Sequence, residues 1–237
     1  MNVITNIFRS SLGKKYIMAV SGFALFLFVV AHLVGNLQVF LGPEAINRYG
    51  HFLQSNEELL WPARVILLTL VCLHIWAAER VTRENYAARP VAYANYKPVG
   101  SSFASRTMLM SGLNVLAFII YHLLHYTVMV KAVNLTGQNF AAKPEFYDAQ
   151  GRHDVFKMMV VGFNNGWVCL FYVVGVGLLC LHLSHGVSSM FQSLGWKSKT
   201  YGPLLDKAAV ALAWLIFLGY ASIPTAILLG YGKEALK

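Results

Sequence analysis

Residues 168–186 read VCLFYVVGVGLLCLHLSHG, an apolar run whose only ionisable side chains, apart from its two cysteines and a tyrosine, are His182 and His185. A transmembrane helix needs about 20 consecutive apolar residues, and this stretch matches that requirement. Polar residues are costly within a bilayer and usually serve a function there. The stretch therefore predicts a membrane helix that carries functional histidines.

The rest of the chain repeats this pattern. Of its 237 residues 57% are hydrophobic and only 12% are charged, about half the charged fraction of a soluble domain. The first apolar block is too long for a cleaved signal peptide, and no small-residue cleavage site follows it. We predict an all-α membrane protein with one domain over residues 1–237 and five transmembrane helices, at roughly 16–40, 61–82, 107–131, 163–190 and 208–231.

The net charge of +9 is distributed in a way that indicates topology rather than nucleic-acid binding. Lysines and arginines precede the first span and crowd the second and fourth connections. By the positive-inside rule the N-terminus is cytoplasmic and the C-terminus outside. We expect the membrane to be a bacterial cytoplasmic membrane. The cations on the predicted cytoplasmic side are Arg9, Lys14, Lys15, Arg80, Arg83, Arg89, Lys97, Arg106, Lys197, Lys199 and Lys207.

The sequence gives no sign of an iron–sulfur, nucleotide or flavin site. Its three cysteines, Cys72, Cys169 and Cys180, lie in predicted spans and form no C-x-x-C pair. Neither a G-x-G-x-x-G motif after a strand nor a Walker A loop is present.

The predicted spans contain an internal repeat. SGFALFLFVVAH at 21–32 and SGLNVLAFIIYH at 111–122 both read Ser-Gly, nine residues, His. VCLHI at 71–75 matches LCLHL at 179–183 in the same way. Both halves begin on the cytoplasmic side, so we expect a parallel repeat with its axis along the membrane normal.

This repeat predicts two histidine pairs. Its axis places His32 opposite His122 in the outer half of the membrane, and His74 opposite His182 in the inner half. At ~1.5 Å rise per residue the two levels differ by roughly 10 Å. A neutral imidazole is a strong axial ligand of haem iron, and two facing imidazoles leave no position for oxygen. We therefore predict two bis-histidine haems b that transfer electrons across the membrane.

Further candidates for contact with the cofactors come from the same repeat. The Ser-Gly pairs lie ten residues inward of the outer histidines, where a glycine would admit a porphyrin edge and a serine would hydrogen-bond near it. Packing between helices explains such small residues equally well. A cation precedes the first and third spans at a similar distance. The candidates are Ser21, Gly22, Ser111, Gly112 and Arg106.

Two further histidines leave alternatives open. His125 and His185 each follow a predicted ligand by three residues, so helical spacing alone does not separate them from it. The repeat does, because Gly35 and Ala77 stand at the equivalent positions. We expect both to lie behind the ligands or near a quinone. An H-x-x-H pair also permits a zinc or proton site, so a histidine-dependent metal or proton transporter is an alternative.

The chain resembles the di-haem cytochrome b membrane anchor of succinate dehydrogenases and fumarate reductases, in its single-chain, five-helix, menaquinone-linked form. The residues that carry the resemblance, besides the span of His74, are AHLVGN at 31–36, NRYGHFLQS at 47–55, SGLNVLAFIIYHLLH at 111–125 and FYVVGVGLLCLHLSHG at 171–186. The resemblance implies axial ligation by the same four histidines.

The resemblance also implies partners and a reaction. It implies a flavoprotein subunit that interconverts succinate and fumarate, and an iron–sulfur subunit, both on the cytoplasmic face against loops 80–106 and 191–207. The chain would be the quinone-reactive subunit of a succinate:menaquinone oxidoreductase. Menaquinone would bind near the outer haem, where the candidates are Asn36, His51, Gln54, Glu57 and Glu58.

One position departs from the family pattern. Some fumarate reductases of this type carry a glutamate two residues before the fourth-helix ligand, and here that residue is Cys180. This favours succinate oxidation without a compensating proton path. A cytochrome b subunit of a hydrogenase or formate dehydrogenase is the alternative within the same redox class.

Overall fold

A computed structural model describes residues 7–88, 91 and 101–236 of the chain. Helices dominate these residues, and the only β pairing among them is an isolated bridge between Tyr147 and His153. Two cations of the predicted basic loop, Arg89 and Lys97, lie outside the described residues.

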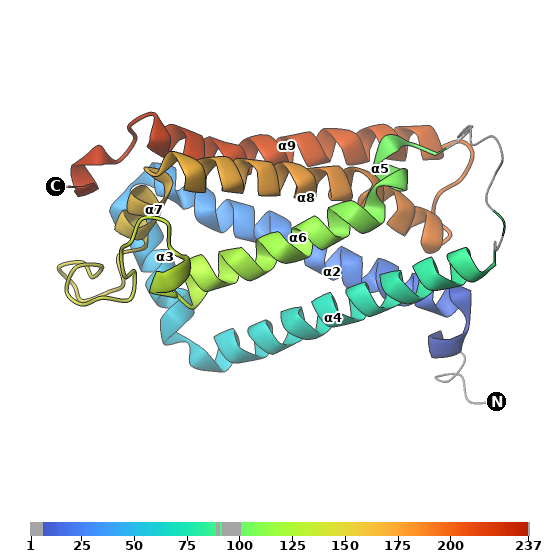
Figure 1. The fold of residues 1–237 in the computed structure, drawn as a ribbon, viewed down its shortest axis with the longest axis horizontal. Coiled ribbons are helices and arrows are strands. Elements are labelled where there is room, and N and C mark those ends of the chain that lie inside the picture. The colour runs from blue at the N-terminus through green and yellow to red at the C-terminus, as the bar shows by residue number, and fades with distance from the viewer. Residues whose placement is uncertain (1–6, 89–90, 92–100, 237) are drawn as a thin grey trace. The chain divides into compact units, whose positions relative to one another are not determined.

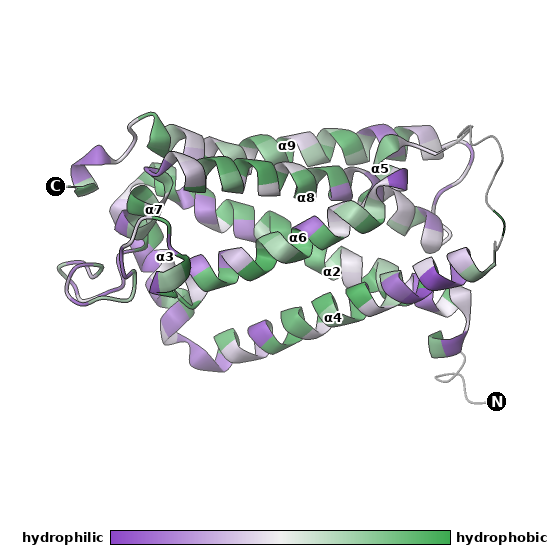
Figure 2. Cartoon of the chain, in the orientation of Figure 1, coloured by the Kyte–Doolittle hydropathy of each residue, from purple (hydrophilic) through white to green (hydrophobic). Residues whose placement is uncertain are grey.

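Five helices are long and apolar enough to cross a membrane, so the prediction of a multi-pass, all-α membrane protein is confirmed (Figure 1). Hydrophobic residues dominate the middle of each of these helices (Figure 2). Several of them begin or end a few residues beyond the predicted limits, because polar residues extend the helices past their apolar blocks. Three predicted limits were wrong in the other direction: the third helix ends at Thr127, the fourth begins at Gly166 and the fifth ends at Leu228. Three of the five spans are single helices: α4 (Glu57–Ala87), α8 (Gly166–Ser193) and α9 (Gly202–Leu228). The first span, Ser11–Leu41, consists of α2 (Ser11–Leu37) and the 3₁₀ turn η1 (Gln38–Leu41). The third span, Met108–Thr127, consists of α6 (Met108–His122) and the π-helical turn η2 (Leu123–Thr127).

Short helices occupy the connections. They are α3 (Pro43–Ser55), α5 (Phe103–Arg106), η3 (Lys131–Val133), α7 (Val155–Phe163) and η4 (Lys233–Leu236). Helix α3 begins sharply after η1, because Gly42 takes a positive φ of 96° and Pro43 occupies the first turn. Proline suits that position, since its missing N–H would have no helical partner there.

The chain divides into two compact units. Unit 1 comprises Met1–Val29, Pro62–Leu109 and Leu181–Ala213, and unit 2 comprises Val30–Trp61, Met110–Cys180 and Trp214–Lys237. The boundaries pass through the long helices, so each of these helices contributes to both units. The single domain and the repeat axis remain predictions.

In unit 1 a buried lysine is neutralised by a partner on another helix. Lys14 on α2 is only 6% exposed and forms an ion pair with Glu84 on α4. Its ammonium also donates to the carbonyl of Arg9 at 2.8 Å, and Ser11 Oγ donates to Glu84 at 2.7 Å. A buried charge requires such partners, so this predicted topological cation also joins α2 to α4.

Unit 2 has an apolar core in which the connection after α6 takes part. Phe140 and Phe146 in this connection are buried against Met158 on α7. The larger cluster of buried residues joins η1, α3, α7, α8 and α9; its members are Val39, Ile46, Phe156, Met159, Val160, Phe163, Val168, Tyr172, Ile223 and Ile227.

Candidate functional site

Unit 1 contains the pair that we predicted for the inner level, and we keep the name inner pair for it. The imidazoles of His74 on α4 and His182 on α8 have ring centres 6.3 Å apart, with 69° between their planes. Both side chains are part-buried. The structure thus brings together two histidines that are 108 positions apart in the sequence.

The ring of His74 is held by the first span. Its Nδ1 lies 3.0 Å from the carbonyl oxygen of Met18, which only accepts hydrogen bonds. In a neutral imidazole Nδ1 therefore carries the proton and Nε2 keeps its lone pair. A metal ligand needs this form, and a backbone carbonyl commonly fixes it.

Ser21 and Gly22 contact this histidine. Ser21 Oγ lies 3.3 Å from His74 Nδ1 and donates to the Ile17 carbonyl at 2.6 Å. A Cβ on Gly22 would come within 3.0 Å of His74 Cε1. In the structure these two residues pack against a predicted ligand, and their contact with a cofactor stays a prediction.

Unit 2 contains the outer pair, named in the same way. The ring centres of His32 on α2 and His122 on α6 are 5.8 Å apart, with 78° between their planes. Phe118 stacks on His122 at 6.1 Å, and the ring of Tyr220 lies 6.3 Å from His32. The hydroxyl of Tyr172 lies 3.4 Å from His122 Nδ1.

Both pairs have the spacing of two imidazoles on one metal ion. A metal–nitrogen distance of about 2 Å, with the ring centre about 1.1 Å beyond the nitrogen, separates the two centres by about 6 Å. The measured values are 5.8 and 6.3 Å. Within the described residues no group of three or more His, Cys, Asp or Glu gathers as a metal site. Each pair contains two imidazoles, the number of axial positions that a porphyrin leaves open on its iron; haem ligation stays a prediction.

The other histidines near the pairs differ from the predicted ligands. His125 is fully buried, with Nδ1 3.1 Å from the Tyr172 hydroxyl and Nε2 3.2 Å from Asn134 Oδ1. Both of its nitrogens are engaged in hydrogen bonds, and its expected place behind His122 or near a quinone stays a prediction. His185 in unit 1 is part-buried on α8.

The remaining candidates for contact with the cofactors take different positions. Ser111 is 3% exposed on α6, with Gly112 beside it. Arg106 is exposed, and its guanidinium donates to the carbonyl of Ser101 at 2.6 Å. In this arrangement the Arg106 side chain binds the backbone just before the third span begins.

Tyr172 was not among the residues predicted from the sequence, although it contacts two of the histidines. It touches both His122 and His125 and is only 6% exposed. The available signal was a polar hydroxyl within an apolar span, because a buried tyrosine hydroxyl usually has a hydrogen-bond partner.

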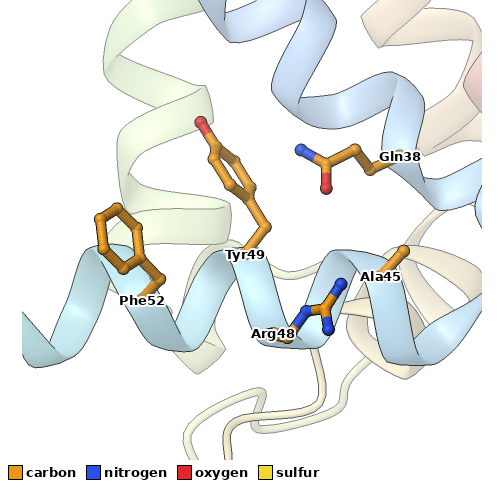
Figure 3. A pocket seen from close by; sticks show the side chains of 5 residues that line it. All are labelled: Gln38, Ala45, Arg48, Tyr49 and Phe52. Carbon is orange, nitrogen blue, oxygen red and sulfur yellow. The ribbon is translucent and has the colours of Figure 1, made fainter.

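A pocket of ≈ 330 Å³ lies beside η1 and α3 in unit 2. Figure 3 shows the side chains of Gln38 and Tyr49 on the same side of α3. The Tyr49 ring packs on Gly35, one turn after His32, where a Cβ would come within 2.8 Å of it. The pocket is lined by Gln38, Ala45, Arg48, Tyr49 and Phe52.

The predicted quinone residues do not line this pocket, and only His51 and Gln54 share helix α3 with it. Asn36 donates to the carbonyl of His32 at 2.7 Å, so its amide serves the backbone of α2. The other four, His51, Gln54, Glu57 and Glu58, are exposed on α3 and at the start of α4.

Comparisons of the chain with family models, with curated proteins and with solved structures found no match.

Proposed function

We propose that this chain is a di-haem cytochrome b, the membrane anchor and electron-transfer subunit of a succinate:menaquinone oxidoreductase. The observation that carries the proposal is the presence of two histidine pairs at 6.3 and 5.8 Å in helices apolar enough to span a membrane. The resemblance in sequence then directs the proposal to this class of complex.

The residues of the two pairs would hold the haems. His74 and His182 would bind one iron, and His32 and His122 the other. When bound in this way, haem transfers single electrons and leaves no iron position for oxygen. Met18 orients the ring of His74 through its carbonyl, and Gly22 leaves room for that ring.

The pocket of Arg48 and Tyr49 is our candidate for the quinone ring. Phe52 and the Tyr49 ring offer apolar and aromatic surface, while Arg48 and Gln38 offer donors to a carbonyl oxygen. Ligand pockets typically combine apolar walls with a few such polar groups. The contact between Tyr49 and Gly35 joins the pocket to the turn of α2 that follows His32.

An optical spectrum of the purified full-length chain tests the proposal. We expect reducible low-spin haem b bands, with two haems per chain. The partner is tested by purification from membranes under mild conditions. A co-purifying flavoprotein with covalent flavin supports the proposal, whereas a nickel or molybdenum protein would support the hydrogenase or formate dehydrogenase alternative. A spectrum without haem b would leave the transporter alternative.

A further inference from the structure

A chain of three hydrogen bonds joins His122 to the connection between α6 and α7. His122 Nδ1 lies 3.4 Å from the Tyr172 hydroxyl, which lies 3.1 Å from His125 Nδ1. His125 Nε2 lies 3.2 Å from Asn134 Oδ1. Tyr172, His125 and Asn134 are 6%, 0% and 7% exposed, so water competes little for these hydrogen bonds.

The orientation of the Asn134 amide is fixed by two backbone groups. The N–H of Thr136, which only donates, lies 3.1 Å from Asn134 Oδ1. Asn134 Nδ2 donates to the carbonyl of Gln138, which only accepts, at 2.9 Å. The atom that faces His125 is therefore an oxygen, and His125 must donate to it from Nε2.

The donor and acceptor roles at Asn134 and His125 determine those of the remaining hydrogen bonds up to His122. The hydrogen-bond partners of His125 are a hydroxyl and an amide, so a buried positive charge on its ring would be uncompensated and the ring stays neutral. A neutral imidazole with its proton on Nε2 has a lone pair on Nδ1, which accepts the single O–H of Tyr172. The Tyr172 oxygen then faces His122 as an acceptor, so His122 carries its proton on Nδ1 and its lone pair on Nε2.

We propose that Asn134 fixes the ring tautomer of His122 through His125 and Tyr172. The three act as positioning residues: they hold His122 with Nε2 available to a metal ion. His125 occupies the π-helical turn η2, a feature frequent at functional sites. The inference rests on the proposed function only in naming haem iron as the partner of Nε2. It also assigns Asn134 a structural role.

Nitrogen NMR of the full-length, haem-free chain in lipid vesicles tests the tautomer directly. With ¹⁵N-labelled histidine, His122 is expected to carry its proton on Nδ1 and His125 on Nε2, assigned by comparison with His122→Gln and His125→Gln. Tyr172→Phe and Asn134→Leu should each remove part of the Nδ1–H signal of His122. Protonation of His122 at Nε2, or an unchanged signal in Tyr172→Phe, would overturn the proposal.

Tyr126→Phe is the matched control. The Tyr126 ring lies 6.2 Å from His122, and its buried hydroxyl has no hydrogen-bond partner within the described part of the chain. The same chemical change there should leave the His122 signal as in the wild type. An equal loss in Tyr126→Phe would show that repacking, and not the hydrogen bond, moves the tautomer.

A second readout uses the haem-loaded chain. A hydrogen bond from Nδ1–H makes a histidine a more basic ligand and favours the oxidised metal. Tyr172→Phe should therefore raise the midpoint potential of the outer haem, whereas Tyr126→Phe should not. Equal potentials in wild type and Tyr172→Phe would overturn the role of Tyr172. Absence of haem from the wild-type chain would refute the proposed function, while the NMR measurement would still decide the tautomer.

Discussion

Gly22 on α2 lies directly against the imidazole of His74 on α4, where a Cβ atom would approach His74 Cε1 to 3.0 Å and Nδ1 to 3.3 Å. Contacts this short require the neighbour to move. The ring cannot move freely, because Met18 holds its Nδ1 at 3.0 Å. The missing side chain at Gly22 thus helps to set the distance between His74 and His182.

Gly22→Ala should therefore disturb the inner pair. We expect overpacking to lower the free energy of unfolding by about 1–3 kcal/mol. We also expect a changed low-spin EPR signal of the inner haem and weaker haem retention. Gly186→Ala is the control, because a Cβ at Gly186 on α8 meets no atom within 4 Å. An unchanged inner signal in Gly22→Ala, or an equal change in Gly186→Ala, would contradict this interpretation.

An ion-pair cluster in unit 2 predicts a pH dependence. Arg152 donates to Glu44 on α3 at 2.6 Å and to Asp148 at 2.7 Å. The hydrogen bond from Arg152 lowers the pKa of Glu44 below its ordinary value of 4.5. Because the pKa is lower in the folded state, this contribution to stability is present above pH 4.5 and is lost as the pH falls through the lowered pKa.

As the pH falls below 4.5, we expect the connection around Arg152 to detach from α3, because Glu44 becomes protonated. Hydrogen exchange of residues 145–155, corrected for its intrinsic pH dependence, measures the effect. Arg152→Gln should already loosen this segment at pH 7 and flatten its pH profile. If wild type and Arg152→Gln show the same profile, the cluster does not hold the connection.

The pocket predicts which residues set the affinity for quinone. Removing a hydrogen bond to a charged donor costs roughly 1.5–3 kcal/mol, so Arg48→Gln should raise the KM for a menaquinone analogue about tenfold or more. Ser55→Ala, at an exposed position of the same helix, is the control. Haem spectra should stay unchanged in both. If His51 or Glu58 variants raise KM while Arg48→Gln does not, the residues predicted from sequence form the site.

The spans and the grouping of the histidines could be predicted because both depend on periodic, local features. Apolar blocks of bilayer length give helices almost regardless of tertiary context. The motif shared by His32 and His122 marks equivalent positions, and the structure places these two rings together.

The surroundings of the histidines could not be predicted in the same way. The hydrogen bond between Tyr172 and His125 depends on how α8 is oriented toward the turn η2. A tyrosine in an apolar span cannot be distinguished by sequence pattern from a core residue. The pocket depends on how α3 folds back so that Tyr49 meets Gly35. Unlike the repeated histidines, these contacts between distant segments are marked by no motif in the sequence.

The proposed function also predicts sensitivity to the membrane potential. If menaquinone takes its protons from outside while succinate oxidation releases protons inside, electrons cross outward. An inside-negative membrane potential then favours this outward electron movement, and with it menaquinone reduction, by about 2.3 kcal/mol per charge per 100 mV. Cys180 stands where some fumarate reductases of the type that the sequence resembles carry a glutamate, which would serve a compensating proton path.

Succinate:menaquinone activity in intact cells or energised vesicles should consequently fall when an uncoupler is added. In proteoliposomes, fumarate reduction by menaquinol should generate a potential. Activity indifferent to the uncoupler, together with electroneutral fumarate reduction, would reject this sidedness.

The most direct test of the two-pair arrangement is a spectroscopic redox titration of the wild type and of single histidine variants. We predict two low-spin haem b components in the wild type. His32→Ala and His122→Ala should delete one of them, and His74→Ala and His182→Ala the other, while His125→Ala and His185→Ala keep both. Absence of haem b from the wild type, or loss of the same component in His32→Ala and His182→Ala, would contradict the account.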